Sequence, residues 1–180
     1  MLGSGSDARG IGSAVMTNPD PFALLGMPRG FEMDRAALHR AWLARAARVH
    51  PDRDAGDPER EAALAALNLA RVTLDDPERR AEALLRLMGG PTREADRTLP
   101  DGFLPEMLAV REEMESDLAS DAAAARSKWG GWASARREEH IAHAAGLFRE
   151  AQSGRAGALM EIRALLNAWR YVERMIERLG

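Results

Sequence analysis

The sequence predicts an all-α protein, and three observations support that prediction. Alanine and leucine, which favour helices, are abundant, whereas β-branched residues are few. Aromatic residues make up only 5% of the chain, although hydrophobic residues make up 46%. Apolar residues also recur at intervals of three and four over long stretches, which is the spacing of an amphipathic helix. We therefore expect helices packed on helices throughout.

Breaks in the helical pattern divide the 180 residues into four parts. Residues 1–18 are rich in glycine and serine and lack the apolar block of a secretory signal, so we expect a disordered tail or an expression remnant. Residues 19–88 should form a first helical module. Residues 89–102 form a linker rich in helix breakers, and residues 103–180 form a three-helix bundle.

The first module should contain four short helices with recognisable starts. After a brief apolar turn, Asp34 is a favourable N-cap for a helix that ends at Val49, because Pro51 disfavours helical geometry in the residue before it. Pro58 suits the first turn of a third helix, and Asp76-Pro77 ends that helix and begins a fourth. The fourth helix carries leucines that we expect to pack between the two modules: Leu84, Leu85 and Leu87.

Three longer helices should enclose the core of the bundle. The first begins near Phe103, and Gly130-Gly131 is interpreted as a break after which the second begins. The third has the most regular apolar stripe in the chain. Its members are Ala158, Ile162, Leu165, Trp169, Val172, Ile176 and Leu179.

Catalysis has little support in the residues present. The chain has no cysteine, which excludes disulfides, thiolate-bound zinc and a thiol nucleophile. It has no glycine-rich phosphate loop, no Gly-x-Ser-x-Gly elbow and no His-Glu-x-x-His pair. His140 and His143 lack an obvious set of further metal ligands, so we expect them on a solvated polar face. We expect no enzyme activity, cofactor or metal.

Charge and hydropathy narrow the class of partner. The net charge of −3 gives no reason to expect nucleic acid, so charge-driven binding must come from a local cluster. No apolar run is long enough to span a membrane, and we expect neither a membrane partner nor insertion. We expect a soluble, cytoplasmic protein.

One local cluster stands where the arginine-rich second helix ends. Arg45 and Arg48 lie in its last two turns, and His50, Pro51 and Asp52 follow directly. A helical hairpin would present these three residues at its tip, where a carboxylate beside a positive surface could dock on a charged protein. The alternative is a capped loop beside solubilising arginines, and the tripeptide alone favours that alternative.

Further motifs change this balance. The module begins DPFALLG, from Asp20 to Gly26, and after the tripeptide it carries an Asn-x-Ala at Asn68 and a D-P-x-x-R at Asp76. In this order the motifs resemble a J-domain, and the resemblance implies that residues 19–88 form it. The resemblance implies that His50, Pro51 and Asp52 contact an HscA/DnaK-type ATPase chaperone and stimulate its ATP hydrolysis. Arg45 and Arg48 would supply the supporting basic surface, and the catalytic site would belong to the partner.

A second motif opens the bundle, where FLPEMLAVREE runs from Phe103 to Glu113. Periodicity leaves two interpretations of its outer leucines about even. They form either an exposed protein-binding patch or the edge of a wide core stripe. Combined with the J-domain motifs, the segment is similar to HscB-type co-chaperones of iron–sulfur cluster biogenesis.

That resemblance implies that four residues bind the IscU-type scaffold protein on which the cluster is assembled: Leu104, Leu108, Arg111 and Glu112. The sequence departs from the family pattern at Pro105, Ala109 and Ala164, where an apolar, an acidic and an aromatic residue are expected. Two alternatives stay open. One is a J-domain co-chaperone with another client, and the other is a helical adaptor without a chaperone partner.

Overall fold

The computed structural model describes residues 19–49 and 57–177, and every regular element within these ranges is a helix. The all-α prediction is confirmed. The helices of the first module are α1 (Pro21–Leu25), α2 (Arg35–Val49), α3 (Pro58–Asp75) and α4 (Pro77–Leu87). Those that follow the linker are α5 (Phe103–Ser120), α6 (Ala122–Gln152) and α7 (Ala158–Ile176). No helix in the described ranges is long and apolar enough to cross a bilayer.

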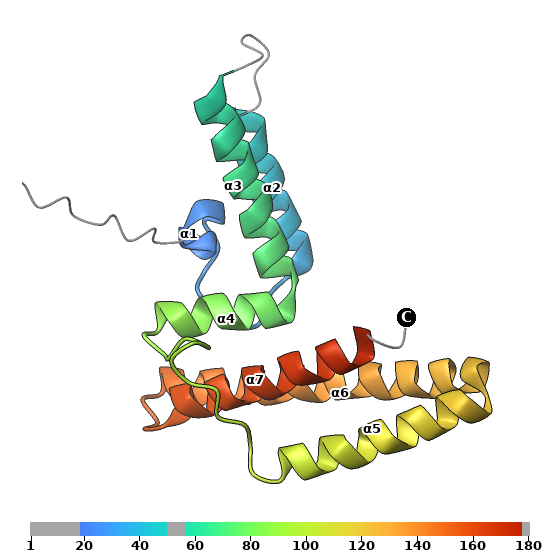
Figure 1. Cartoon of the computed structure of the whole chain (residues 1–180). Coiled ribbons are helices and arrows are strands. Elements are labelled where there is room, and N and C mark those ends of the chain that lie inside the picture. Colours follow the sequence, from blue (N-terminus) through green and yellow to red (C-terminus); the bar gives the residue numbers. More distant parts are fainter. Residues whose placement is uncertain (1–18, 50–56, 178–180) are drawn as a thin grey trace, which may run out of the picture.

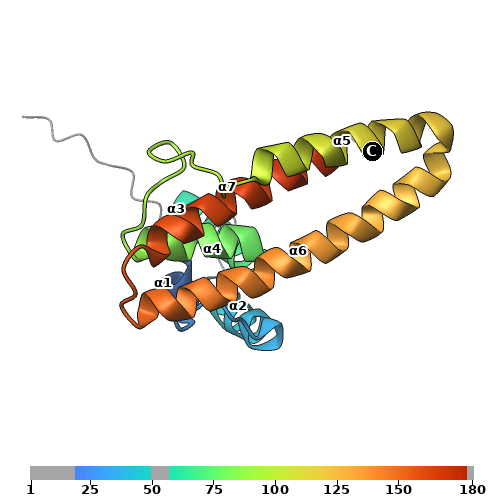
Figure 2. The same ribbon diagram turned by 90° about the horizontal axis from the view of Figure 1, so that it is seen from below.

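The helices form two groups that meet at α4. The α2–α3 hairpin stands upright on α4, and the three long helices lie beneath it (Figure 1). Seen from below, α5 and α6 form a long hairpin with α7 alongside, and α4 lies behind the end of that bundle (Figure 2). The end of α2 at Val49 and the start of α3 at Pro58 are therefore the parts of the hairpin farthest from the bundle.

Aspartate side chains fix most of the helix starts, as the sequence predicts. The Asp34 carboxylate accepts from the backbone N–H of Ala36 at 2.8 Å, so α2 begins where expected. Asp57 caps α3 in the same way, through the N–H of Glu59 at 3.0 Å. Asp76 ends α3 and caps α4 with Pro77 in the first turn, which gives a sharp corner between these helices.

The expected break at Gly130-Gly131 is wrong, because α6 runs through both glycines. The break lies at Asp121, whose carboxylate accepts from the next N–H groups of α6. Trp129, beside the glycines, is only 3% exposed, and its ring meets that of Trp132 at 5.8 Å between centroids. Glycine in a helix costs about 1 kcal/mol relative to alanine. Burial of a large side chain contributes about 2 kcal/mol or more, so tertiary packing outweighs the local preference.

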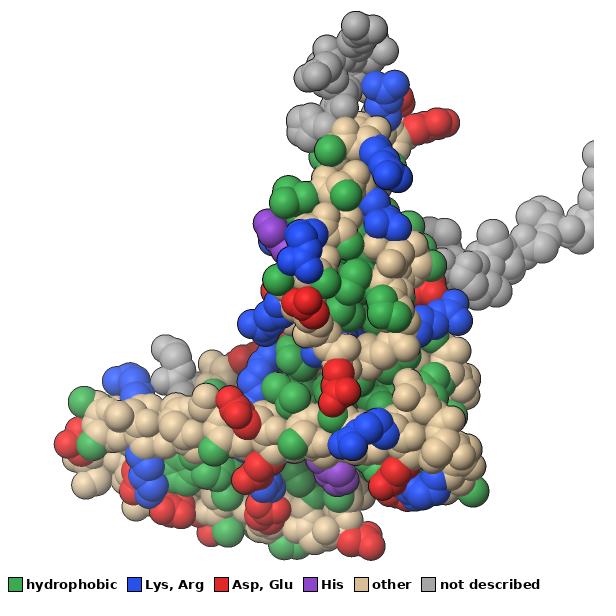
Figure 3. Space-filling view, turned by 180° about the vertical axis from the view of Figure 1, so that it is seen from behind, with side chains coloured by type: hydrophobic (Ala, Val, Ile, Leu, Met, Phe, Trp, Pro, Cys, Tyr) green, Lys and Arg blue, Asp and Glu red, His purple; other side chains and the backbone are tan. Residues whose placement is uncertain are grey.

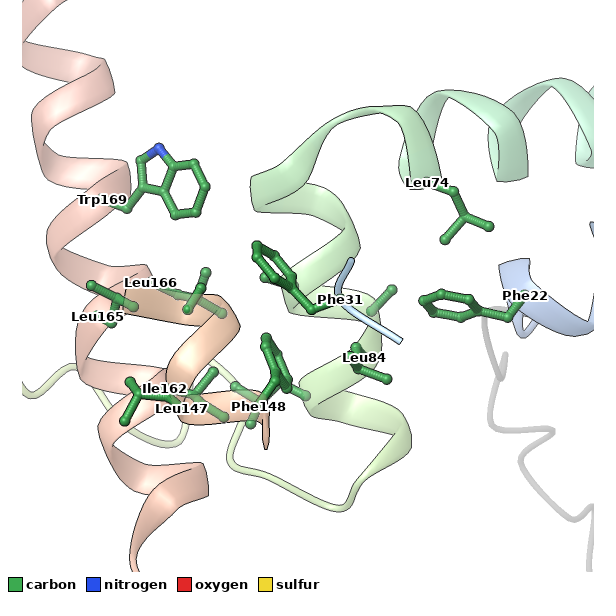
Figure 4. Close-up of a cluster of buried hydrophobic side chains, with 14 of the residues drawn as sticks. Phe22, Phe31, Leu74, Leu84, Leu147, Phe148, Ile162, Leu165, Leu166 and Trp169 are labelled. Carbon is green, nitrogen blue, oxygen red and sulfur yellow. The ribbon is translucent and has the colours of Figure 1, made fainter. Parts of the chain in front are cut away.

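A shared hydrophobic core joins the two groups of helices. It contains Phe22 and Leu74 from the first group and Phe148 and Trp169 from the bundle, with α4 between them (Figure 4). The leucines of α4 lie as expected: Leu84 and Leu85 are buried in this core, and Leu87 packs against it. A second cluster fills the far end of the bundle, between α5, α6 and α7. The apolar stripe of α7 is buried from Ala158 to Val172, and Leu179 lies outside the described residues.

Arg80 of α4 is the polar centre of the shared core. It is only 6% exposed, and its guanidinium donates to the backbone carbonyls of Phe31, at 2.7 Å, and Leu74. It also lies over the Phe31 ring, which in turn stacks on Phe148 of α6 with centroids 5.4 Å apart. One side chain thus joins the α1–α2 loop, the end of α3 and, through Phe31, the bundle.

Ion pairs surround this core on its solvent side. Each pair joins an arginine of the bundle to an acid of the first group: Arg137 to Asp76 at 3.3 Å, Arg163 to Glu82 at 2.8 Å and Arg170 to Glu78 at 4.0 Å. The Arg163 side chain is only 2% exposed, so this buried arginine needs its partner Glu82, and the pair favours one relative placement of the two groups. Burial raises the pKa of the Glu78 carboxyl.

The linker follows the bundle closely. The side-chain amide of Asn167, on α7, donates to the carbonyl oxygens of Asp96 at 3.1 Å and Thr98 at 2.9 Å. Asn167 is 8% exposed, so these bonds are shielded from water. The backbone on both sides of Arg97 is thereby held against α7.

His140 also departs from the expected solvated face. It is 7% exposed and stacks on Trp169 of α7 with ring centroids 5.5 Å apart, whereas His143 remains exposed. The reason is that His140 shares a face of α6 with Ala144 and Leu147, which point into the core. Burial, together with the charge of Arg136, lowers the pKa of His140 to about 4.

Replacing Arg80 should destabilise the whole structure. In Arg80→Met, two buried carbonyls lose their donor, so we expect the free energy of unfolding in urea to fall by about 2–4 kcal/mol. Arg79→Met removes the exposed neighbour and should change it by less than about 0.5 kcal/mol. Equal effects of the two substitutions would contradict the role assigned to Arg80.

His140 should make stability depend on pH. The unfolded state takes up a proton near pH 6.5, but the folded state does so only near pH 4, so the unfolded state holds more protons between these values. The free energy of unfolding should therefore fall by about 2–3 kcal/mol as the pH drops through this window. Urea unfolding at a series of pH values should show a shallower dependence in His140→Phe, whereas His143→Phe should keep the wild-type slope. Parallel curves for all three proteins would refute the assignment.

Candidate protein-binding surfaces

The first candidate surface is the arginine-rich face of α2. Arg48 is exposed in the last turn of the helix, and Arg45 is half-buried one turn earlier. Neither forms an ion pair with any residue that the structure describes. Basic side chains gather along the stem that α2 and α3 form (Figure 3). His50, Pro51 and Asp52, which follow directly in the sequence, lie outside the described residues.

Arg45 is held between two helices. Its guanidinium lies against Gly26, the residue that ends α1 in a left-handed conformation with φ of 57°. A Cβ on Gly26 would stand 1.9 Å from Nη2 of Arg45, so this placement of the arginine requires glycine. Arg45 is therefore positioned by the fold, whereas Arg48 projects freely.

The Asn-x-Ala motif holds the hairpin together below its tip. The Asn68 side-chain oxygen accepts from the Trp42 indole N–H at 3.0 Å, which joins α3 to α2. Arg71 lies 4.5 Å from the centre of the Trp42 ring, on the same side of the hairpin. Ala70 is 3% exposed, and its small side chain belongs to the core. These residues fix the spacing of the two helices that lead to residues 50–56.

The second candidate surface lies on α5. Leu104 is 54% exposed and Leu108 is 58% exposed, whereas Phe103 and Met107 are buried. The interpretation as a wide core stripe is therefore wrong, and the two leucines form an apolar pair on the surface. Arg111 and Glu112 are exposed one turn further along the helix. Two large apolar side chains next to charged ones are typical of a protein-binding patch.

Tyr171 extends this patch, and the sequence analysis did not identify it. It lies on α7, is 39% exposed, and packs edge-on against Phe103 with centroids 5.5 Å apart. The sequence feature that could have identified it is the position of Tyr171 off the apolar stripe of α7. An aromatic residue at such a position is exposed and available for contact. Ala164, where the family resemblance expects an aromatic, lies two turns earlier on α7, roughly 10 Å along the axis.

Neither surface, as far as the structure describes it, contains a cluster of metal-binding side chains. Within the part of the chain that the structure describes, no group of three or more His, Cys, Asp or Glu residues could hold a metal ion. The exposed groups that stand together are arginines, leucines, a tyrosine and the carboxylate of Glu112. Such side chains recognise other proteins by charge and apolar contact.

Comparison with known proteins gives one matching family and several relatives. Residues 20–83 match the DnaJ domain. The chain is 40% identical over 108 residues to a protein of Chromobacterium violaceum described as "Co-chaperone protein HscB homolog". It is 37% identical over 102 residues to the "Co-chaperone protein HscB" of Proteus mirabilis. These alignments cover 57% and 53% of the chain, and the chain spans 62% and 59% of the two relatives.

Two solved structures resemble the whole chain. "Chaperone HscB from Vibrio cholerae" is 30% identical, with a TM-score of 0.62 over 90% of this chain and 100% of that one. "Crystal structure of human co-chaperone protein HscB" gives a TM-score of 0.71 at 23% identity, over 99% of this chain and 92% of that one. The likeness to the human structure concerns the fold alone. The likeness to the Vibrio cholerae structure extends to sequence, over the full length of that chain.

Proposed function

The chain belongs to the HscB family of J-domain co-chaperones, and we propose that it couples an HscA/DnaK-type chaperone to an IscU-type iron–sulfur cluster scaffold protein. Its J-domain would stimulate the ATPase of the chaperone, and its bundle would deliver the scaffold, promoting cluster assembly and transfer in the cytoplasm. The observation that carries this proposal is the exposed Leu104–Leu108 pair of α5 in a chain that also matches the DnaJ domain.

The chaperone contact is assigned to His50, Pro51 and Asp52 with Arg45 and Arg48 behind them. The two arginines lie in the last turns of α2, directly before the tripeptide, and form no ion pair with a residue that the structure describes. A positive surface of this kind steers an acidic partner and sets its orientation. ATP hydrolysis would take place in the chaperone, so this protein would act as a regulator of the enzyme.

The scaffold contact is assigned to Leu104, Leu108, Arg111 and Glu112, and we add Tyr171. The leucines and the tyrosine offer apolar area that is exposed in the unbound protein, and such residues contribute most of the affinity at an interface. The charged residues beside them would set the register of the partner. Because one core and three ion pairs join the two groups of helices, scaffold and chaperone would be held in a fixed relation.

The chaperone contact predicts a loss of stimulation. A DnaK-type chaperone should hydrolyse ATP faster with the wild-type chain, and His50→Gln should leave its rate at the unstimulated value. Arg48→Ala should weaken the stimulation, because it removes a positive charge from the docking face. Arg79→Ala removes an exposed arginine of α4 and should stimulate as wild type does. The J-domain assignment fails if the wild type does not stimulate, and the assignment of the tip fails if His50→Gln stimulates fully.

The scaffold contact predicts a loss of binding without a loss of fold. Leu104→Ala with Leu108→Ala should weaken binding of the scaffold protein in a pull-down by at least about tenfold. Because both leucines are exposed, the double variant should unfold in urea at the wild-type midpoint. Met160→Ala, an exposed apolar change on α7 outside the patch, should bind normally. If the double variant binds the scaffold protein as well as the wild type does, the leucine patch is not the scaffold contact and would serve a different client.

A further inference from the structure

A cleft lined by arginines lies between the linker, α5 and α7. Its volume is about 570 Å³. Four arginines from three segments line it: Arg93 and Arg97 of the linker, Arg111 of α5 and Arg174 of α7. Glu94 is the one acidic residue on its wall. The chain as a whole carries a net charge of −3, so this positive cluster is local and opposite in sign to the molecule.

The positive charge of the cleft is only partly compensated by nearby acids. Among the described residues, Arg93, Arg97 and Arg174 form no ion pair within 4.0 Å, whereas most other bundle arginines do. Arg111 bonds Glu115 through Nε at 2.7 Å, which leaves its terminal nitrogens available. Like charges gathered on one wall repel each other, and an anionic ligand would relieve that repulsion. Guanidinium groups bind carboxylates through paired hydrogen bonds, which suits them to this task.

The fold holds the cleft in place. Asn167 bonds the carbonyls of Asp96 and Thr98, on the two sides of Arg97, and so fixes the backbone from which this arginine projects. Met175, beside Arg174 on α7, is buried and gives the cleft an apolar floor together with half-buried Leu99. The linker arginines are thus presented by an ordered segment.

The shape and position of the cleft indicate the kind of ligand. A single small anion would occupy a minor part of 570 Å³ and engage few of the arginines, whereas an extended peptide can place several carboxylates along them. The apolar floor suits the side chains of such a peptide. The cleft also shares Arg111 and Tyr171 with the surface of Leu104 and Leu108, so a protein docked on the leucines could extend into it.

We propose that this arginine cleft binds an acidic, extended segment of the protein that docks on Leu104 and Leu108. The identity of that protein as the cluster scaffold rests on the proposed function. The leucines would supply apolar contact, and the cleft would orient the partner and speed its association at low salt.

The test uses the full chain and a fluorescein-labelled hexaglutamate peptide, followed by fluorescence anisotropy at low ionic strength. We expect saturable binding, weakened at least about tenfold by Arg97→Gln with Arg174→Gln, because two of the cleft guanidiniums are lost. The matched control is Arg79→Gln with Arg149→Gln, which removes the same charge from exposed sites outside the cleft and should stay within about twofold of wild type. Arg93→Gln with Arg97→Gln provides a second test that leaves α7 unchanged.

Several results would overturn the proposal. The first is that the wild-type chain shows no saturable binding of hexaglutamate. The second is that the control variant loses as much affinity as the cleft variants, and the third is that both cleft variants bind with wild-type affinity. Inorganic phosphate provides a further check. If phosphate displaces the labelled peptide at a lower concentration than unlabelled hexaglutamate does, the cleft is a site for a free anion, and the proposal is refuted.

The scaffold protein distinguishes this proposal from the proposed function. If the scaffold binds the cleft variants as tightly as wild type, the cleft proposal fails and the proposed function stands. If the scaffold protein does not bind the wild-type chain, but hexaglutamate binds it through the cleft, the proposed function fails. In that case the cleft remains a site for the acidic segment of another protein.

Discussion

The contact of Arg80 with Phe31 and Leu74 determines how the rest of the molecule is placed. A charged side chain 6% exposed is tolerated because carbonyl oxygens and an aromatic face receive its guanidinium. Since Phe31 stacks on Phe148, the same contact that closes the first group of helices also joins it to the bundle. Folding of the J-domain and docking of the bundle therefore depend on shared residues.

This sharing gives the D-P-x-x-R motif a physical explanation. Asp76 caps α4 with one carboxylate oxygen and meets Arg137 of the bundle with the other, at 3.3 Å. Pro77 begins α4, and Arg80 enters the core one turn later. A motif that is local in sequence thus sets the angle between α3 and α4 and also the position of the bundle against α4. The two candidate surfaces lie on opposite sides of that corner, so it would fix the geometry between two bound partners.

Local signals were sufficient to predict the helices and most of their starts, because capping by Asp34 or Asp76 depends only on neighbouring residues. They failed where another helix decides the outcome. Gly130-Gly131 remains helical because the adjacent tryptophan is buried against α5 and α7, and His140 is buried because Trp169 covers it. Exposure of Leu104 and Leu108 could not be deduced from periodicity, since it depends on how far α7 extends over α5. The cleft arginines come from separate segments, and no sequence pattern joins them.

Charge and apolar contact have separate roles on the α5 side of the molecule. Two exposed leucines and a tyrosine offer too little area for tight binding without additional contacts, because a stable interface buries roughly 800 Å² on each partner. Arginines near them add orientation and a faster encounter, at an affinity that salt can tune. If the chain releases a client after transfer, as the proposed function requires, it would benefit from this division, since apolar area alone would slow dissociation. The fold keeps the linker arginine Arg97 at this surface because Asn167 bonds the carbonyls on both sides of it and so holds the linker against α7.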